Sequence, residues 1–281
     1  MFSRRWLINY LLFTLIIIFT WIGLKYPIRE DQKIIRNSIT QMRPQDITRI
    51  KIETADAVIR LQKKGSRWLI TDPIQWFGNN ITAERLTTLA TLEATSELPR
   101  DQIKLSTLGL SIPRAVVMLN DQSIYFGNTN QIGNRRYLLV DDKVYLSSDI
   151  HFPFIAQGLS GLVDGRLLPA SLDVKSIKSA SFSLQKQSSN WISDNPGHPP
   201  EAIQALLRNW QTLPASAIRA YDDSHTPLHK VIVTSEKTGT IEFFVLSIQP
   251  EIILARPDLK LQYHFPEHQY YTLLSLDGAH E

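Results

Sequence analysis

The sequence contains no cysteine among its 281 residues. This absence excludes disulfide bonds, a thiolate nucleophile and zinc sites that are built on thiolates. It also excludes the acylated cysteine that anchors a bacterial lipoprotein. Because the absence fits either side of a membrane, it leaves the compartment open.

The chain has almost no net charge outside its first 29 residues. Residues 1–29 hold four basic side chains (Arg4, Arg5, Lys25 and Arg29) and no acidic one, so 30 − 4 = 26 basic residues remain against 27 acidic ones. A nearly neutral remainder gains little counterion-release free energy on a phosphate backbone. We therefore expect no nucleic acid partner.

One long uncharged run is present near the amino terminus. Residues 6–24 contain no charged side chain, and a helix of this length spans about 28 Å, close to the ~30 Å hydrocarbon core of a bilayer. Trp6 and Tyr10 lie near one end and Trp21 near the other, where an aromatic belt is expected, and Leu24 closes the run. The run is longer than the apolar region of a cleaved signal peptide and lacks a small-residue cleavage site. The sequence predicts an uncleaved transmembrane helix.

The basic residues around this span set the expected orientation. Arg4 and Arg5 favour a cytoplasmic amino terminus, whereas Lys25 and its basic neighbours lie on the opposite side. A signal anchor at the start of a chain normally leads export of the residues downstream of it. We expect a cytoplasmic tail at residues 1–5, a charged stalk at residues 25–46 and the bulk of the chain in the periplasm.

Two segments of the remaining chain match at an offset of 123 residues. The stretch from Arg60 to Trp68 aligns with Ser183 to Trp191, since 183 − 60 = 123, and the two share Leu-Gln-Lys, Ser and Trp at equal spacing. Tryptophans in equal places favour core packing over ring platforms for a glycan or peptide. We expect the core of the repeat to be formed by Leu61, Trp68, Leu184 and Trp191.

An amphipathic helix is expected after each matched segment. In the second copy it begins near Pro200, and its apolar stripe at i, i+3, i+4 and i+7 consists of Ile203, Leu206, Leu207 and Trp210. In the first copy Thr82 is the expected cap, and the stripe contains Leu86 and Leu89. The sequences Leu98-Pro99 and Leu213-Pro214 are expected to end the two helices.

Beyond each helix the apolar period changes from 3.6 to 2, which predicts strands. The expected strands are 115–119, 123–126, 137–140 and 144–146 in the first half, then 231–233, 241–246, 252–255, 259–263 and 270–274. Each half is therefore strands, one helix and an antiparallel meander. The predicted fold class is α+β, with similar lobes at residues 47–170 and 171–281 after the transmembrane helix.

Several motifs of the first half resemble those of a known family. They run from Trp68 to Pro73, Leu108 to Pro113, Ile124 to Gly127, Arg136 to Val140 and Asp164 to Leu168. With them, residues 47–190 resemble the bacterial family called domain of unknown function 4340. The resemblance implies an envelope protein, some of whose relatives accompany or are fused to ABC-type export or gliding-associated membrane components. It implies no catalytic residue.

Two histidine pairs have the i, i+4 spacing of a metal site. They are His225 with His229 and His264 with His268. A proline lies inside each pair and opposes the helix that would aim both rings at one ion, and neither pair has the Glu of H-E-x-x-H. We expect solvated turns and no metal.

Three other segments contain residue types of known sites. Asp222, Asp223, Ser224 and His225 have the side chains of a hydrolytic triad, but adjacent loop residues rarely aim at one another and no G-x-S-x-G is present. Residues 127–133 lack the Lys-Ser/Thr of a phosphate-binding loop and are expected to form a hairpin loop, with Arg135-Arg136 solvated beside it.

These patterns predict a non-enzymatic, single-pass protein of the bacterial inner membrane without a cofactor. Its periplasmic domain is expected to be an accessory or scaffolding component of an envelope complex, with an ABC-type exporter as one candidate. The expected partners are the bilayer, through residues 6–24, and other envelope proteins, for which sheet edges can accept a strand. Two alternatives stay open: a module that binds an envelope glycan, peptide or lipid between the lobes, and an enzyme with dispersed residues.

Overall fold

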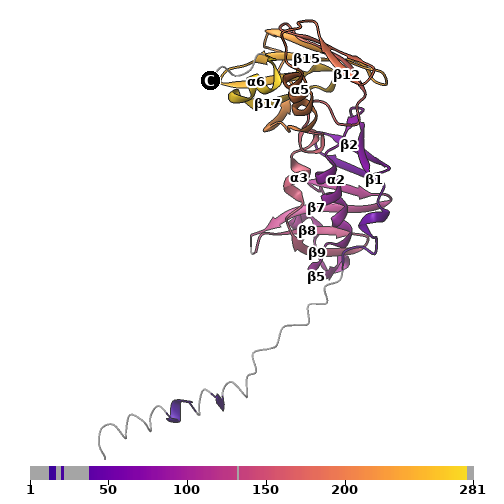
Figure 1. Ribbon diagram of the computed structural model, residues 1–281. Helices are drawn as coiled ribbons and strands as arrows, with labels where there is room; N and C mark the ends of the chain where they lie inside the picture. Colours follow the sequence, from indigo (N-terminus) through magenta and orange to yellow (C-terminus); the bar gives the residue numbers. More distant parts are fainter. Residues whose placement is uncertain (1–12, 17–19, 22–37, 132, 277–281) are drawn as a thin grey trace, which may run out of the picture. The chain divides into compact units, whose positions relative to one another are not determined.

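The strands that the structure describes form two antiparallel sheets (Figure 1). The computed structural model describes residues 13–16, 20–21, 38–131 and 133–276. Strands β1 to β9 make a nine-stranded sheet, and β10 to β17 make an eight-stranded sheet. We call each sheet with its own helices the first and the second lobe; both belong to the compact unit Ser38–Glu281. A few helices beside antiparallel sheets give the α+β class.

The first lobe contains the nine-stranded sheet. Its strands are β1 (Arg49–Thr54), β2 (Val58–Lys64), β3 (Arg67–Asp72), β4 (Trp76–Phe77), β5 (Ala94–Pro99), β6 (Ala115–Leu119), β7 (Gln122–Asn130), β8 (Arg135–Val140) and β9 (Lys143–Ser148). Its helices are η1 (Pro44–Asp46), α2 (Asn80–Thr87), η2 (Thr88–Thr91), η3 (Arg100–Gln102), η4 (Leu105–Leu108), α3 (Phe152–Ala156) and α4 (Leu159–Leu162).

The second lobe contains the eight-stranded sheet. Its strands are β10 (Val174–Lys178), β11 (Ser183–Gln187), β12 (Asn190–Ser193), β13 (Ala217–Ala220), β14 (His229–Ser235), β15 (Gly239–Ser247), β16 (Glu251–Arg256) and β17 (Leu261–Pro266). Its helices are α5 (Pro200–Thr212), η5 (Pro257–Leu259), η6 (Glu267–Gln269) and α6 (Tyr270–Leu273).

The two sheets have the same strand order. The first is β4-β3-β2-β1-β6-β7-β8-β9-β5, and the second is β12-β11-β10-β14-β15-β16-β17-β13. Four strands (β1 to β4) lead to helix α2 in the first lobe, and three (β10 to β12) lead to helix α5 in the second; in both lobes the next strand lies at the far edge, and a four-stranded meander ends beside it. Among the described strands, only β4 has no counterpart in the other sheet.

The two matched sequence segments form the same hairpin. In the first lobe Lys63 pairs with Trp68 across β2 and β3, and in the second Lys186 pairs with Trp191 across β11 and β12. The first loop residue has a left-handed backbone in both, with φ +61° at Gly65 and φ +54° at Ser188. The spacing that both segments share is therefore the spacing of a two-residue hairpin turn.

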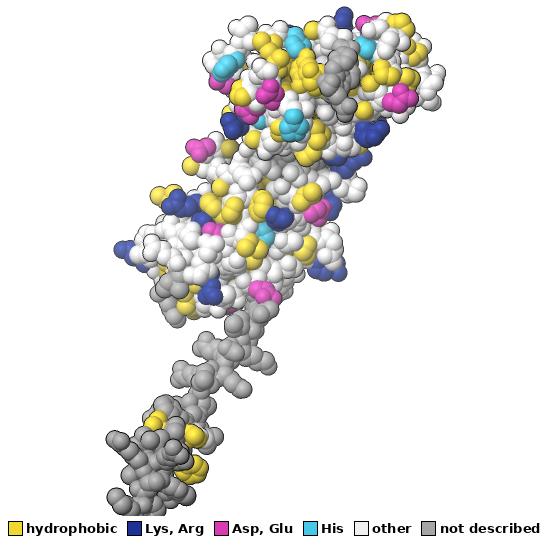
Figure 2. Space-filling view, turned by 60° about the vertical axis from the view of Figure 1, so that its left-hand side comes forward, with side chains coloured by type: hydrophobic (Ala, Val, Ile, Leu, Met, Phe, Trp, Pro, Cys, Tyr) yellow, Lys and Arg dark blue, Asp and Glu magenta, His cyan; other side chains and the backbone are white. Residues whose placement is uncertain are grey.

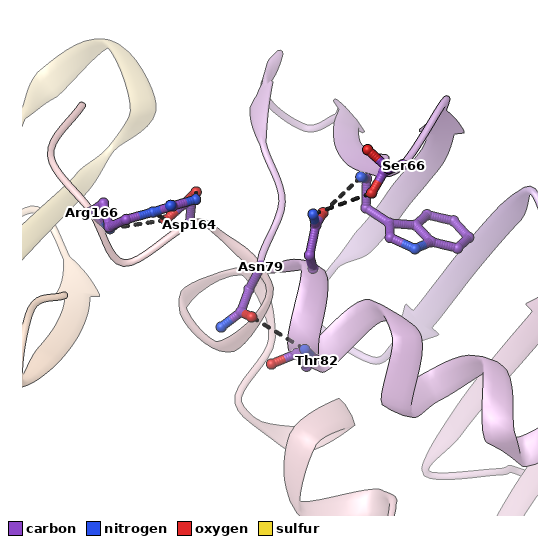
Figure 3. Close-up of polar contacts among 7 residues, drawn as sticks. Ser66, Asn79, Thr82, Asp164 and Arg166 are labelled. Carbon is purple, nitrogen blue, oxygen red and sulfur yellow. Dashed lines mark hydrogen bonds and ion pairs between the residues drawn. The ribbon is translucent and has the colours of Figure 1, made fainter. Parts of the chain in front are cut away.

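Helix α2 begins three residues earlier than its sequence suggests. Asn79, not Thr82, is the cap: its side chain accepts the Thr82 backbone N–H at 3.2 Å, while Thr82 itself is buried (Figure 3). Asparagine is preferred to threonine as a cap, and its side-chain oxygen satisfies a backbone N–H of the first turn. Asn80 then ties the helix to the hairpin, since its Oδ1 accepts the Trp68 N–H at 2.8 Å and its Nδ2 donates to the Ser66 carbonyl at 3.3 Å.

The far ends of the two long helices differ. Helix α5 runs from Pro200 to Thr212 as expected and buries Ile203, Leu206 and Trp210. Helix α2 is shorter and continues as the 3-10 helix η2, so Leu98-Pro99 does not end it but lies in strand β5. The expected strand 270–274 is also wrong, because Tyr270–Leu273 is helix α6. A short apolar run fits a buried helix as well as a strand.

The expected core residues do not share one environment. Leu61, Trp68 and Leu184 are buried, whereas Trp191 is only partly buried and packs at the margin of the core. In the second lobe Trp210 of helix α5 is fully buried instead, with its ring 5.2 Å from that of Phe243 and edge-on to it. The fully buried indole therefore comes from the hairpin in the first lobe and from the helix in the second.

Only part of the amino-terminal segment is described. Residues 13–16 and 20–21 are helical, and Trp21 is exposed. Within the described ranges no helix combines the length and the hydrophobicity that a bilayer crossing requires. Trp6, Tyr10, Leu24 and most of the predicted span 6–24 lie outside the described residues, as do the predicted tail and residues 25–37 of the predicted stalk.

Candidate functional site

An open pocket of about 560 Å³ lies in the first lobe beside helices α2 and α3. We call it the α2–α3 pocket, and its lining residues are Glu84, Arg85, Thr88, Ile150, His151 and Phe154. Figure 2 shows a histidine among hydrophobic side chains on this lobe, with a basic and an acidic side chain beside it. Helix α2 supplies the exposed residues Glu84 and Arg85, and Thr88, the first residue of η2, follows them at the i+4 and i+3 positions.

The Glu84 carboxylate accepts hydrogen bonds from two side chains of the same lobe. The Trp68 indole N–H donates to Glu84 Oε1 at 2.7 Å, and Lys63 Nζ lies 2.7 Å from the same oxygen. Burial raises the pKa of Glu84, but the hydrogen bonds from Lys63 and Trp68 outweigh it and hold the pKa below its usual value. The negative charge at this side of the pocket is therefore compensated within the fold.

Arg85 lies next to Glu84 and has a different environment. Its guanidinium carbon lies 4.5 Å from the centre of the Phe154 ring, and among the described residues no carboxylate forms an ion pair with it. A guanidinium over an aromatic face is attracted by the ring quadrupole and keeps its hydrogen-bond donors available. No sequence pattern indicates this pair, because 154 − 85 = 69 positions separate its members.

His151 is the buried histidine of the pocket lining. It is only 3% exposed, and its Nε2 lies 2.9 Å from Thr88 Oγ1. The Thr88 hydroxyl donates its single proton to the Arg85 carbonyl at 2.7 Å, so Nε2 carries the ring proton. Nδ1 is then a buried acceptor that has no partner among the described residues. Burial lowers the pKa of His151 below its ordinary value, and the nearby Arg85 charge acts in the same direction. The imidazole ring of His151 therefore lines the pocket in its neutral form.

A second open pocket, of about 690 Å³, lies at the end of the second lobe. Its lining residues are Ile248, Gln249, Glu267, His268, Tyr270 and Tyr271. The rings of Tyr270 and Tyr271 lie 5.4 Å apart and nearly perpendicular, and Tyr271 is 54% exposed. An exposed aromatic ring among polar side chains suits a ligand with both hydroxyl groups and an apolar face.

The histidine pairs that have the spacing of metal ligands occupy different environments. His264 is buried: its Nδ1 lies 3.0 Å from Glu251 Oε1, and its Nε2 lies 3.0 Å from Gln262 Nε2. A carboxylate only accepts, so Nδ1 is protonated and Nε2 accepts from the amide. Glu251 and His264 are therefore followed by the Gln262 amide, and an amide cannot serve as the nucleophile of a catalytic triad. Within the part of the chain that is described, no group of three or more potential metal ligands is present.

The acidic turn brings the residue types of a triad together without the geometry of one. His225 is exposed, and its Nδ1 lies 3.3 Å from Asp222 Oδ2 and 3.2 Å from Ser224 Oγ. A triad needs the acid on one ring nitrogen and the hydroxyl on the other. Because both partners share Nδ1, this arrangement cannot relay a proton from the serine to the imidazole. His229, the other member of the pair with His225, begins strand β14.

Arg136 is not the solvated loop residue that the sequence predicts. It lies on strand β8, is 5% exposed and forms a two-pronged ion pair with Asp149 at 2.7 and 2.8 Å. Its Nη1 donates to the Gly127 carbonyl at 2.6 Å, and its guanidinium lies 3.6 Å from the Phe152 ring centre. Residues 127–130 belong to strand β7, so the hairpin loop is shorter than predicted.

A buried arginine of the second lobe contacts the first. Arg256 is 1% exposed, pairs with Asp258 at 2.8 and 2.7 Å, and lies 4.2 Å from the ring centre of Trp76 in β4. Nearby, Asp164 accepts from the Arg166 guanidinium at 2.9 Å (Figure 3), and the Gly165 carbonyl accepts the Ala215 N–H at 2.8 Å. The Asp-Gly-Arg motif therefore holds the chain where it passes from one sheet to the other.

Two sheets of equal strand order, each with one long helix, define an α+β protein built on a repeated topology. The chain belongs to the family described as "Domain of unknown function (DUF4340)", whose model matches residues 68–230. This match confirms the family resemblance seen in the sequence motifs. Neither a curated protein nor a solved structure matches the chain.

Proposed function

We propose that the protein is a non-enzymatic accessory or scaffolding component of an envelope complex in the bacterial inner membrane. In this proposal residues 6–24 anchor the chain, the amino terminus is cytoplasmic and the two lobes are periplasmic. The uncharged run with aromatic residues at its ends supports the anchor, and an ABC-type exporter is one candidate for the complex.

The observation that carries the binding role is the α2–α3 pocket. It combines an arginine stacked on a half-buried aromatic ring with one exposed apolar side chain, Ile150, which is 60% exposed. Arginine and aromatic residues dominate the few contacts that supply most of the affinity in protein interfaces. The outermost strands of the sheets, β4 and β5 in the first and β12 and β13 in the second, offer additional backbone groups for strand addition.

Site-specific photocrosslinking in cells tests the binding role. A photoreactive residue at Ile150 is expected to give a discrete adduct with another envelope protein. A residue at Ile112, which is 87% exposed but does not line the pocket, is the matched control and should give none. The absence of an adduct at Ile150, or equal adducts at both positions, would contradict the proposal.

Fractionation of the full chain tests the anchor. The protein should stay in the membrane pellet after alkaline extraction, and a periplasm-dependent reporter fused at its carboxyl terminus should be active. A deletion of residues 6–24 should release the protein from the membrane. A full-length chain that is freely soluble, or a reporter that is active only inside the cell, would contradict this part.

The second pocket favours one alternative, a module that binds an envelope glycan. The exposed ring of Tyr271 can stack on a sugar, and Gln249, Glu267 and His268 can bind its hydroxyl groups. Titration of the full chain with chitotetraose, followed by calorimetry, tests this alternative. Tyr271→Ala should abolish the binding, whereas Leu228→Ala, at an exposed position outside the pocket, should not.

A further inference from the structure

The charges around the α2–α3 pocket do not cancel. Glu84 is compensated by Lys63 and the Trp68 N–H, and His151 is buried and neutral. Arg85 carries a full positive charge and, among the described residues, has an aromatic ring but no carboxylate as its partner. The pocket is therefore apolar with one uncompensated cation at its wall.

The position of this cation is fixed before any ligand binds. Arg85 projects from helix α2, and Phe154 of helix α3 lies beneath its guanidinium at 4.5 Å. The Thr88 hydroxyl donates to the Arg85 carbonyl and accepts from His151 Nε2, and these bonds link the carboxyl end of α2 to the amino end of α3. A stacked guanidinium loses less conformational freedom when it binds a carboxylate than an unrestrained one does.

Apolar surface surrounds the cation. Ile150 and Phe154 line the pocket, and Ile81, one helical turn before Arg85 on the exposed face of α2, is 77% exposed. Exposed apolar side chains beside a pocket mark interaction sites more often than isolated ones do. The volume of about 560 Å³ accommodates a few side chains of a partner and not a folded domain.

We propose that the α2–α3 pocket binds a segment of a partner protein in which a carboxylate lies beside a bulky apolar side chain. The carboxylate pairs with the Arg85 guanidinium, and the apolar side chain packs against Ile150 and Phe154. A membrane surface of anionic lipids is less suited to this site, because such surfaces attract clusters of lysine and arginine. This inference rests on the proposed function and specifies the chemistry of the partner.

Charge reversal at Arg85 tests the inference in the photocrosslinking experiment at Ile150. In the full-length chain, Arg85→Glu should reduce the adduct about tenfold or more, as expected for a central arginine of an interface. Arg85→Lys should retain part of it. Arg67→Glu, an exposed arginine of the same lobe outside the pocket, is the matched control and should leave the adduct unchanged. Equal unfolding midpoints of all variants show that the fold is retained.

The adduct itself provides a second readout. Mass spectrometry should place the crosslink within a few residues of an Asp or Glu in the partner, and changing that acid to Lys should restore the adduct with Arg85→Glu. If the wild-type adduct forms but does not depend on Arg85, or is a lipid, the inference fails while a binding role for the surface stands. If the wild-type chain gives no adduct, the proposed function fails and the inference fails with it.

Discussion

The two lobes share a strand order but fill their cores differently. In the first lobe the hairpin supplies the fully buried tryptophan, Trp68, and helix α2 has only eight residues. In the second lobe the helix supplies it, Trp210, and the hairpin tryptophan Trp191 is only partly buried. One topology thus takes its fully buried tryptophan from different elements in the two lobes.

The largest changes in the free energy of unfolding are expected when the tryptophans are replaced one at a time. Trp68→Ala and Trp210→Ala should each lower the free energy of unfolding by about 3–5 kcal/mol, since both leave large cavities. Trp191→Ala should cost roughly 1 kcal/mol, as expected for a partly exposed site. Urea unfolding of the full chain in detergent measures all three. A cost for Trp191→Ala equal to that for Trp68→Ala would restore the equivalence that the sequence suggests.

The second largest difference between the lobes is expected at their buried arginines, Arg136 and Arg256. Asp149, the partner of Arg136, has a side chain that is 10% exposed, whereas Asp258, the partner of Arg256, is 56% exposed. Asp149→Ala should cost about 3 kcal/mol or more, because it leaves a buried cation that water cannot reach. Asp258→Ala should cost less, because water can enter the exposed position of its carboxylate even though the Arg256 guanidinium is buried. Urea unfolding measures the cost of both substitutions, and equal costs for Asp149→Ala and Asp258→Ala would contradict this prediction.

The pH dependence of stability should also differ between the lobes. Burial lowers the pKa of His151 in the first lobe, so below its ordinary value of 6.5 the unfolded chain binds a proton that the folded chain resists. Stability is therefore complete above about pH 6.5 and decreases as the pH falls. His151→Gln should reduce the loss of thermal stability between pH 7.5 and 5.5. His229→Gln, at a half-buried residue of the second lobe whose pKa burial also lowers, should reduce it less; the reverse order would refute this prediction.

The hairpin turns should give the smallest effect. Gly65 adopts φ +61° and a Cβ there would meet nothing within 4 Å, so Gly65→Ala should cost roughly 1 kcal/mol through backbone strain alone. Ser188 has the same backbone with φ +54°, and Ser188→Gly should change stability by less than about 1 kcal/mol. Thermal unfolding measures both. A stabilised Gly65→Ala variant would show that the two turns do not share their conformation.

Much of the fold could be predicted because its signals are local. The period of Ile203, Leu206 and Trp210 predicts helix α5, and the shared spacing of the two hairpins indicates a repeat. The extent of helix α2 could not be predicted well, because Asn79 and Thr82 are both plausible caps. The predicted strand at residues 270–274 is wrong because a short apolar run does not distinguish a helix from a strand.

The candidate site depends on contacts that no local pattern encodes. Arg136 is buried because β8 and β9 place Asp149 beside it, and this register is not visible in the sequence. Arg85 meets Phe154 only after the whole meander of the first sheet has formed between them. The sequence also places the helical residues of α2 without indicating which of their exposed side chains will border a pocket.

The strand after each long helix lies at the far edge of its sheet. Among the strands that the structure describes, β5 pairs only with β9 and β13 only with β17, in each case after three further strands have been passed. A chain that folds from its amino terminus must therefore leave β5, and later β13, without a hydrogen-bonded neighbour until the last strand of that sheet is available. Such pairing of distant segments has a high contact order, which slows folding and leaves an open edge exposed meanwhile. Each lobe is thus closed by its last strand, and the first can close before the second has begun.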